Sequence, residues 1–136
     1  MVRRIALAIA TWEADRFIAT WLGLYTLVWG LALFGPADFS SANYRGMASV
    51  MSEGAWALLM TTLGANRIGF AVWWRWPIAQ VGLSVLAAAV WMFIAVSVWV
   101  SSVGSATGPW HFVLVSLANV VLAFRLMLYP RGSGGH

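Results

Sequence analysis

The sequence predicts an all-α membrane protein, a polytopic bundle of four transmembrane helices. Hydrophobic residues make up 62% of the 136 residues and charged residues only 9%, whereas soluble domains average about 45 to 50% and about 25%. Long apolar runs recur at the length that crosses a bilayer. The basic residues, all arginines, also fall mainly on one side of the resulting topology. These three observations together favour a membrane bundle over a soluble fold.

Four stretches of the chain have the length of a membrane span. The hydrocarbon core is ~30 Å thick and takes about 20 mostly apolar helical residues to cross. The predicted spans are residues 17–35, 55–73, 78–100 and 111–129, within a single membrane domain of residues 1–136. The second span has the required length but contains Asn66 and Arg67.

The arginine distribution indicates that residues 55–73 do cross. Lys and Arg are enriched in cytoplasmic segments of membrane proteins. With four spans and the N-terminus inside, only Arg45 lies outside. The arginines in or near inside segments are Arg3, Arg4, Arg16, Arg67, Arg75, Arg125 and Arg131. A three-span topology loses this bias, so we expect four crossings of a cell inner membrane with both termini in the cytoplasm.

The segments between and before the spans predict interfacial structure. We expect short helices on the membrane surface at residues 1–15 and at residues 41–52, and a flexible tail at residues 130–136. The N-terminus is expected to stay in the mature chain, because the apolar stretch IALAIA is shorter than the ~7 to 15 residues of a signal-peptide core. The expected interfacial anchors are Trp73, Trp74, Arg75, Trp76, Arg125 and Tyr129.

Small and polar residues predict the faces through which the helices pack. Lipid removes the hydrophobic incentive for helix pairing, so close approach and interhelical hydrogen bonds decide the contacts. The expected packing positions are Ala19, Gly23, Thr26, Gly30, Ser84, Ala88, Ser116 and Ala123. In the second span we expect Thr62, Asn66 and Gly69 to form the tight face. Trp29 and Trp91 lie deep in their spans, as packing residues or as contacts with other subunits.

Arg67 allows two interpretations. It lies about six residues from the inside end of its span, roughly 9 Å deep, so we expect its side chain to snorkel to the headgroups as a topological anchor. The alternative is a small channel or transporter with a polar path. The candidate lining residues of that path are Asn66, Arg67, Thr62 and Asn119.

The residues that carry catalysis are not arranged in a recognisable pattern. The chain has no cysteine and two histidines, His111 and His136, and neither pairs with a carboxylate at motif spacing. No phosphate-binding loop, dinucleotide glycine pattern or zinc-binding HExxH is present. We therefore expect no enzyme, no catalytic or metal-ligating residue and no cofactor. The arginines form no basic stripe, so nucleic acid is not an expected partner.

Three segments resemble a known type of protein. WALLMTTLGANRIGFAVW, WRWPIAQVGLSVLAAAVWMFIAV and NVVLAFRL resemble small four-span membrane proteins encoded in tailed-bacteriophage genomes, over roughly residues 55–127. The resemblance implies a product of the host inner membrane, with holin-like lysis or envelope remodelling as candidate roles. Familiar holins carry a charged C-terminal tail, which this chain lacks.

The expected function is that of a non-enzymatic integral inner-membrane protein of phage or bacterial origin. Its partners are the lipid bilayer and further copies of itself, assembled into a homo-oligomer through small-residue helix faces. Two alternatives stand beside this one. The first is the channel or transporter, and the second is an accessory subunit of a larger membrane complex.

Overall fold

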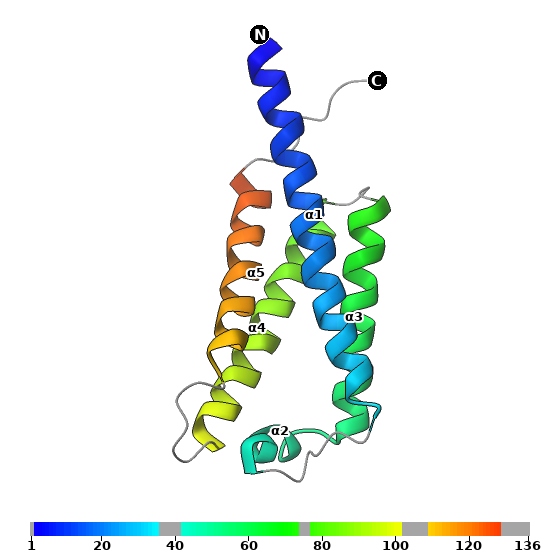
Figure 1. Cartoon of the computed structure of the whole chain (residues 1–136), viewed down its shortest axis with the longest axis vertical. Helices are drawn as coiled ribbons and strands as arrows, with labels where there is room; N and C mark the ends of the chain where they lie inside the picture. Colours follow the sequence, from blue (N-terminus) through cyan, green and yellow to red (C-terminus); the bar gives the residue numbers. More distant parts are fainter. Residues whose placement is uncertain (1, 36–41, 74–76, 102–108, 129–136) are drawn as a thin grey trace.

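The computed structural model of the protein describes residues 2–35, 42–73, 77–101 and 109–128. Their elements are α1 (Val2–Ala32), η1 (Ala42–Tyr44), α2 (Arg45–Ala48), α3 (Glu53–Trp73), α4 (Pro77–Ser101) and α5 (Trp110–Leu128). No strand occurs among these residues, so the predicted all-helical class is confirmed for them. The four long helices lie side by side, and α2 sits at the end of the molecule opposite the start of α1 (Figure 1).

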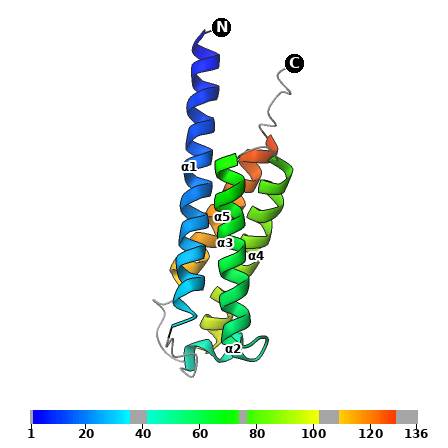
Figure 2. The same ribbon diagram turned by 90° about the vertical axis from the view of Figure 1, so that its right-hand side faces the viewer.

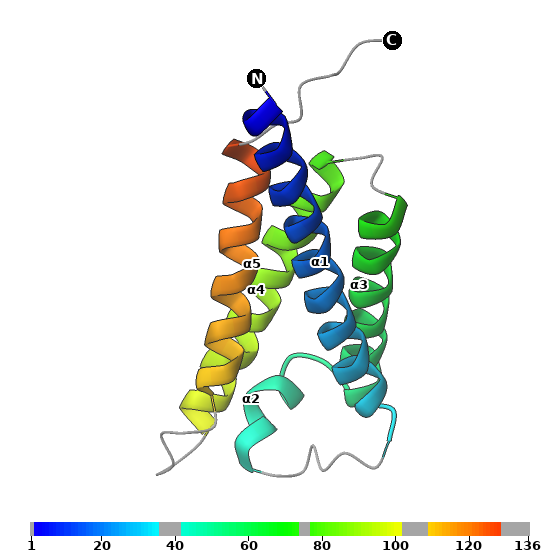
Figure 3. The ribbon, with the colours of Figure 1, turned by 45° about the horizontal axis from the view of Figure 1, so that its top comes forward.

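The long helices are arranged as two close pairs. Helix α1 packs mainly against α3, and α4 packs mainly against α5, with fewer close approaches between the pairs. Figure 3 shows α1 and α3 on one side and α4 and α5 on the other. The start of α1 and the end of α5 lie at the same end of the molecule (Figure 1). We call this the terminal end, and the end that holds α2 the α2 end.

Helix α1 is longer than expected. It runs without interruption from Val2 to Ala32, so residues 2–15 are not a separate interfacial helix. The reason is local, because no glycine or proline precedes Gly23 to break the helix. Its 31 residues span roughly 46 Å at 1.5 Å per residue, and its first turns project beyond the other helices (Figure 2).

Glycines bring α1 and α3 into backbone contact. A Cβ atom added at Gly30 would lie 2.5 Å from the backbone nitrogen of Thr61. One added at Gly64 would lie 2.7 Å from the Cα of Leu27 and 2.8 Å from the carbonyl oxygen of Gly23. Real Cβ atoms do not tolerate such distances, so the two helices approach this closely only because the side chains are missing.

The packing face of α3 differs from the expected one. Its buried residues are Trp56, Ala57, Met60, Leu63, Gly64, Arg67 and Ala71. Thr62 and Asn66 are exposed, and an added Cβ at Gly69 would meet nothing within 4 Å. The expectation for this face is therefore wrong by about one position in register. Residues one apart on a helix point about 100° apart, so a small error in register selects the wrong face.

The other pair is held by small residues and one hydrogen bond. The hydroxyl of Ser116 on α5 donates to the backbone oxygen of Ala88 on α4, at 2.8 Å.

All eight positions expected from the sequence to mediate packing are buried in the structure: Ala19, Gly23, Thr26, Gly30, Ser84, Ala88, Ser116 and Ala123. They are used inside this chain, between its own helices.

Large side chains fill the space between the two pairs. Trp91 of α4 is fully buried, and its ring centroid lies 5.3 Å from those of Tyr25 and Trp29 and 5.6 Å from that of Phe112. Its indole N–H donates to the hydroxyl of Thr26, at 3.2 Å. Trp29 and Trp91 thus pack within the chain. Buried indole groups of this kind combine a large apolar area with one satisfied polar atom.

The first loop folds back onto the bundle. Met47 of α2 is fully buried, and its backbone oxygen accepts a hydrogen bond from the indole N–H of Trp56 at 3.0 Å. The backbone N–H of Gly46 donates to the hydroxyl of Ser101 at the end of α4. The expected helix at residues 41–52 is therefore shorter in the structure, Arg45–Ala48 preceded by a 3-10 turn, and it packs on its own chain.

Two of the described helices are long and apolar enough to cross a membrane by length and composition. They are Ile78–Ser101 and Trp110–Leu128. This gives limited support to the membrane class, since the core helix of a soluble protein can pass the same test. Helices α1 and α3 are not among the two.

Candidate functional site

Arg67 and Asn119 meet in the interior of the protein. Arg67 has an exposed fraction of 0%, and so has Asn119. The Nη1 group of Arg67 donates a hydrogen bond to Oδ1 of Asn119. The side-chain amide of Asn119 donates in turn to the backbone oxygen of Val115, at 2.7 Å, which holds Oδ1 towards the arginine. A guanidinium on α3 is thereby fixed by an amide on α5.

The expected snorkelling of Arg67 is wrong. A snorkelling side chain would carry its charge to the edge of the bundle, but this one is covered on all sides. Among the residues that the structure describes, no carboxylate lies within salt-bridge distance of Arg67. The ion pairs there join Arg16 to Glu13 and Arg125 to Asp15. Arg67 is therefore a buried cation whose nearest fixed partner is a neutral amide.

Two polar residues of α4 complete the site. The amide of Gln80 donates to the backbone oxygen of Arg67 at 3.3 Å. Its Oε1 and the hydroxyl of Ser84 are buried without a hydrogen-bond partner, as are Nε and Nη2 of Arg67. We call Arg67, Gln80, Ser84 and Asn119 the Arg67 cluster. Buried polar atoms without partners are uncommon and costly, so the open atoms of this cluster need an explanation.

Ser84 lies at the level of Asn119. Helices α4 and α5 run in opposite directions (Figure 1), and Ser116 bonds to the carbonyl of Ala88. One turn further along α5 is Asn119, and one turn back along α4 is Ser84. Helical side chains lean towards the start of their helix, so the side chain of Arg67 leans towards the start of α3. Along α4, Ser84 lies in the same direction from Gln80. The groups of the cluster without a hydrogen-bond partner therefore lie on α3 and α4 and face the same interior region.

The other two residues of the expected polar path lie elsewhere. Thr62 and Asn66 are exposed, and the amide of Asn66 donates to the backbone oxygen of Thr62, at 2.9 Å, on its own helix. The structure thus brings Arg67 and Asn119 together and leaves Thr62 and Asn66 on the outer face of α3. Gln80 was missed by the sequence analysis, although it is the only glutamine in the chain and lies in an otherwise apolar run.

A second polar region ties three helices together towards the terminal end. Nε of Arg125 on α5 lies 2.9 Å from Oδ1 of Asp15 on α1. Arg16 donates from Nε to the carbonyl of Ala71 and from Nη2 to that of Val72, at 3.2 and 3.3 Å. These carbonyls belong to the last turn of α3, which has no further helix to bond them. No pattern in the sequence predicted this network.

The expected interfacial anchors are only partly described. Trp73 is highly exposed at the end of α3, and Arg125 is paired with Asp15 at the same end. Trp74, Arg75, Trp76 and Tyr129 lie outside the described residues. Within the described part of the chain, no three His, Asp or Glu side chains group together to hold a metal ion.

Comparisons with protein-family models, with curated proteins and with solved structures give no match to this chain. The described part of the chain is all-helical, contains two helices apolar enough to cross a membrane, and holds an arginine in its interior.

Proposed function

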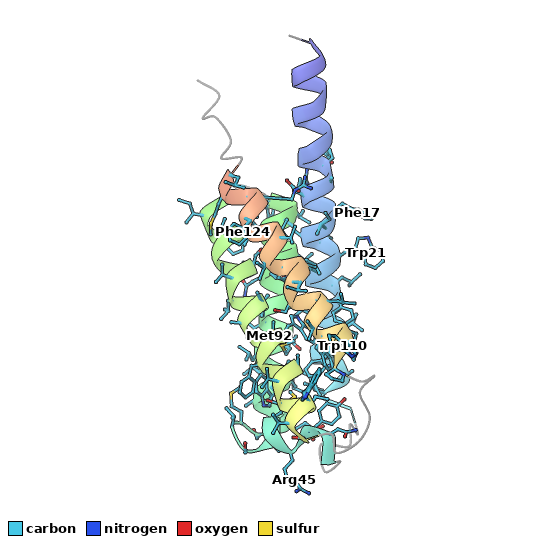
Figure 4. The ribbon with its side chains drawn as sticks, turned by 90° about the vertical axis from the view of Figure 1, so that its left-hand side faces the viewer. Phe17, Trp21, Arg45, Met92, Trp110 and Phe124 are labelled. Atoms are coloured by element: carbon cyan, nitrogen blue, oxygen red, sulfur yellow. The ribbon has the colours of Figure 1, made fainter. Side chains whose placement is uncertain are left out.

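We propose that this chain is a non-enzymatic integral protein of a bacterial inner membrane, crossed four times by α1, α3, α4 and α5. The observation that carries the proposal is an apolar outer belt. On α1 the exposed large side chains are Phe17, Trp21, Leu24, Tyr25, Val28 and Leu31. Phe17 and Trp21 point away from the bundle (Figure 4). A soluble helix would carry polar residues on that face.

The charged residues support the same assignment. No charged residue occurs in residues 17–35, 77–101 or 110–124. Residues 54–73 contain one charged residue, Arg67, which is buried. At the terminal end, near the last turn of α3, lie the contacts of Asp15, Arg16 and Arg125. Arg45 lies at the opposite end of the molecule, the α2 end (Figure 4). Residues 17 to 35 of the chain would span about 28 Å as a helix, close to the thickness of the hydrocarbon core.

Cysteine labelling tests the four-span topology. The natural chain has no cysteine, so single replacements report one position each. We expect Val2→Cys and Gly134→Cys to react with a membrane-impermeant maleimide only after the cytoplasmic side is opened, and Ser49→Cys to react in intact spheroplasts. Labelling of positions 2 and 134 from opposite sides would contradict four crossings.

A second function, passage of a small solute through the bundle, is favoured by the Arg67 cluster. The small-residue faces expected to drive self-assembly are occupied by contacts within the chain, which removes the main argument for a purely structural role. An arginine in a membrane interior is costly, and its usual reason is a functional site. We therefore propose that Arg67 and Asn119 form the binding step of a channel or transporter.

Flux into vesicles tests this second function. Reconstituted protein should pass a small anion faster than protein-free vesicles, and Arg67→Lys should lower that flux about tenfold, because lysine keeps the charge but loses the planar donor geometry. Asn66→Leu is the matched control, since Asn66 is adjacent in sequence but exposed and bonded to its own helix. Equal flux in vesicles with and without the protein would exclude the passage function.

A further inference from the structure

The free atoms of Arg67 define a particular kind of binding edge. A guanidinium has five N–H donors in a fixed plane. Nη1 is used by Asn119, whereas Nε and Nη2 are buried without a partner. The Nε and Nη2 groups form one edge of the plane, with two parallel N–H bonds. This edge fits two oxygens carried on a single atom, as in a carboxylate or a related oxyanion.

The charge of the site points to an anionic ligand. A buried ion without a compensating charge costs several kcal/mol even after relaxation, and the amide of Asn119 contributes only a dipole. Of the carboxylates that the structure describes, Asp15 pairs with Arg125 and Glu13 pairs with Arg16. Glu53 begins α3, fourteen residues before Arg67, or roughly 21 Å along the helix. One negative charge placed on the open edge of Arg67 would neutralise the site.

Ser84 supplies a further donor for the same ligand. Its hydroxyl is buried, has no partner, and lies at the level of Asn119 on the neighbouring helix, as the bond between Ser116 and Ala88 requires. A hydroxyl can rotate to donate to an oxygen that Arg67 holds. Gln80, near the start of α4, fixes that helix to the backbone of Arg67, which positions Ser84 relative to the guanidinium.

We propose that the Arg67 cluster binds a small monovalent oxyanion, of the class of nitrate, formate or bicarbonate, through Nε and Nη2 of Arg67 and the hydroxyl of Ser84. Arg67 is covered within the chain, so the ligand is a free small ion rather than the headgroup of a surrounding lipid. This inference rests on the proposed passage function for its biological meaning, but binding itself is measurable without any flux.

Thermal unfolding in a non-ionic glycoside detergent, with nitrate replacing chloride at constant ionic strength, tests the proposal. The detergent contains no phosphate or carboxylate, so a headgroup cannot supply the anion. A ligand that binds only the folded state raises the unfolding temperature in a saturable way. We expect this rise with nitrate and with formate for the natural protein, and a smaller effect of chloride, which cannot engage both N–H groups through two oxygens.

Three variants assign the effect to the cluster. Arg67→Lys should weaken the apparent nitrate affinity about tenfold, by loss of the paired donors. Ser84→Ala should weaken it several-fold without harming the fold, because it removes a hydroxyl that has no partner. Arg125→Lys, at the terminal end, should respond like the natural protein.

The possible results separate the two proposals. Three results would overturn the oxyanion site. Nitrate fails to stabilise the natural protein, nitrate stabilises it no more than chloride does, or the stabilisation is unchanged in both Arg67→Lys and Ser84→Ala. Nitrate binding without vesicle flux would retain the site and remove the passage function. Vesicle flux without nitrate binding would retain the passage function and remove the oxyanion site.

Discussion

Asn119→Leu should lower the free energy of unfolding by about 3 kcal/mol, the cost of leaving a buried charge without its hydrogen-bond partner. Leucine has the same branched shape as asparagine but offers no acceptor to Nη1 of Arg67. The measurement is reversible unfolding of the full chain in mixed micelles, followed by tryptophan fluorescence. Ordinary interhelical hydrogen bonds in membranes contribute only ~0.6 kcal/mol, so a large effect would identify the charge as the cause.

The chain offers a matched control for this substitution. Asn66→Leu removes the same side chain from the outer face of α3, where the amide bonds to its own helix, and it should change stability by less than about 0.5 kcal/mol. The double variant Arg67→Met with Asn119→Leu should regain about 2 kcal/mol over Asn119→Leu alone, because an apolar pair replaces the orphaned ion. If Asn119→Leu and Asn66→Leu had equal stabilities, Asn119 would not support Arg67.

Gly64→Ala should destabilise the protein by about 2 kcal/mol. The added methyl would lie 2.7 Å from the Cα of Leu27 and 2.8 Å from the oxygen of Gly23. Both atoms belong to the backbone of α1, so no side-chain rotation can relieve the clash, and the helices must separate. Unfolding in mixed micelles measures the loss.

Gly69→Ala on the same helix serves as the control for Gly64→Ala. Apart from its own stretch of helix, no atom lies within 4 Å of a Cβ placed there, so only the backbone effect remains. Alanine in a helix is favoured over glycine by roughly 0.5 to 1 kcal/mol, and Gly69→Ala should therefore be neutral or stabilising. Equal losses at both glycines would show that α1 and α3 do not approach at Gly64.

The sequence predicted the long helices well because their signal is local. The expected spans 78–100 and 111–129 differ by one residue at each end from α4 and α5, and 55–73 differs from α3 only at its start. Pro77 begins a helix, where a missing N–H costs nothing. The first helix begins well before the expected span 17–35 and takes in the expected surface helix 1–15 from Val2 onward, because the charged residues Glu13, Asp15 and Arg16 do not break a helix.

The buried contacts were harder to predict because they depend on neighbours. Asn66 and Asn119 are the same residue type in similar apolar runs, yet one bonds to its own helix and the other to a buried arginine. Nothing in the local sequence distinguishes them. The small residues of α1, by contrast, repeat at helical spacing, and all four are buried in the structure.

The sequence by itself determined the helical class, the position of the helices and the apolar character of their outer surface, because these depend on composition and on periodicity within one segment. Only the tertiary structure decided that Arg67 turns inward to Asn119, that Gly64 rather than Gly69 meets α1, and that Gln80 and Ser84 join the site. The direction of a side chain depends on the rotation of its helix about its own axis. That rotation is set by the shapes of the neighbouring helices, which no single segment encodes.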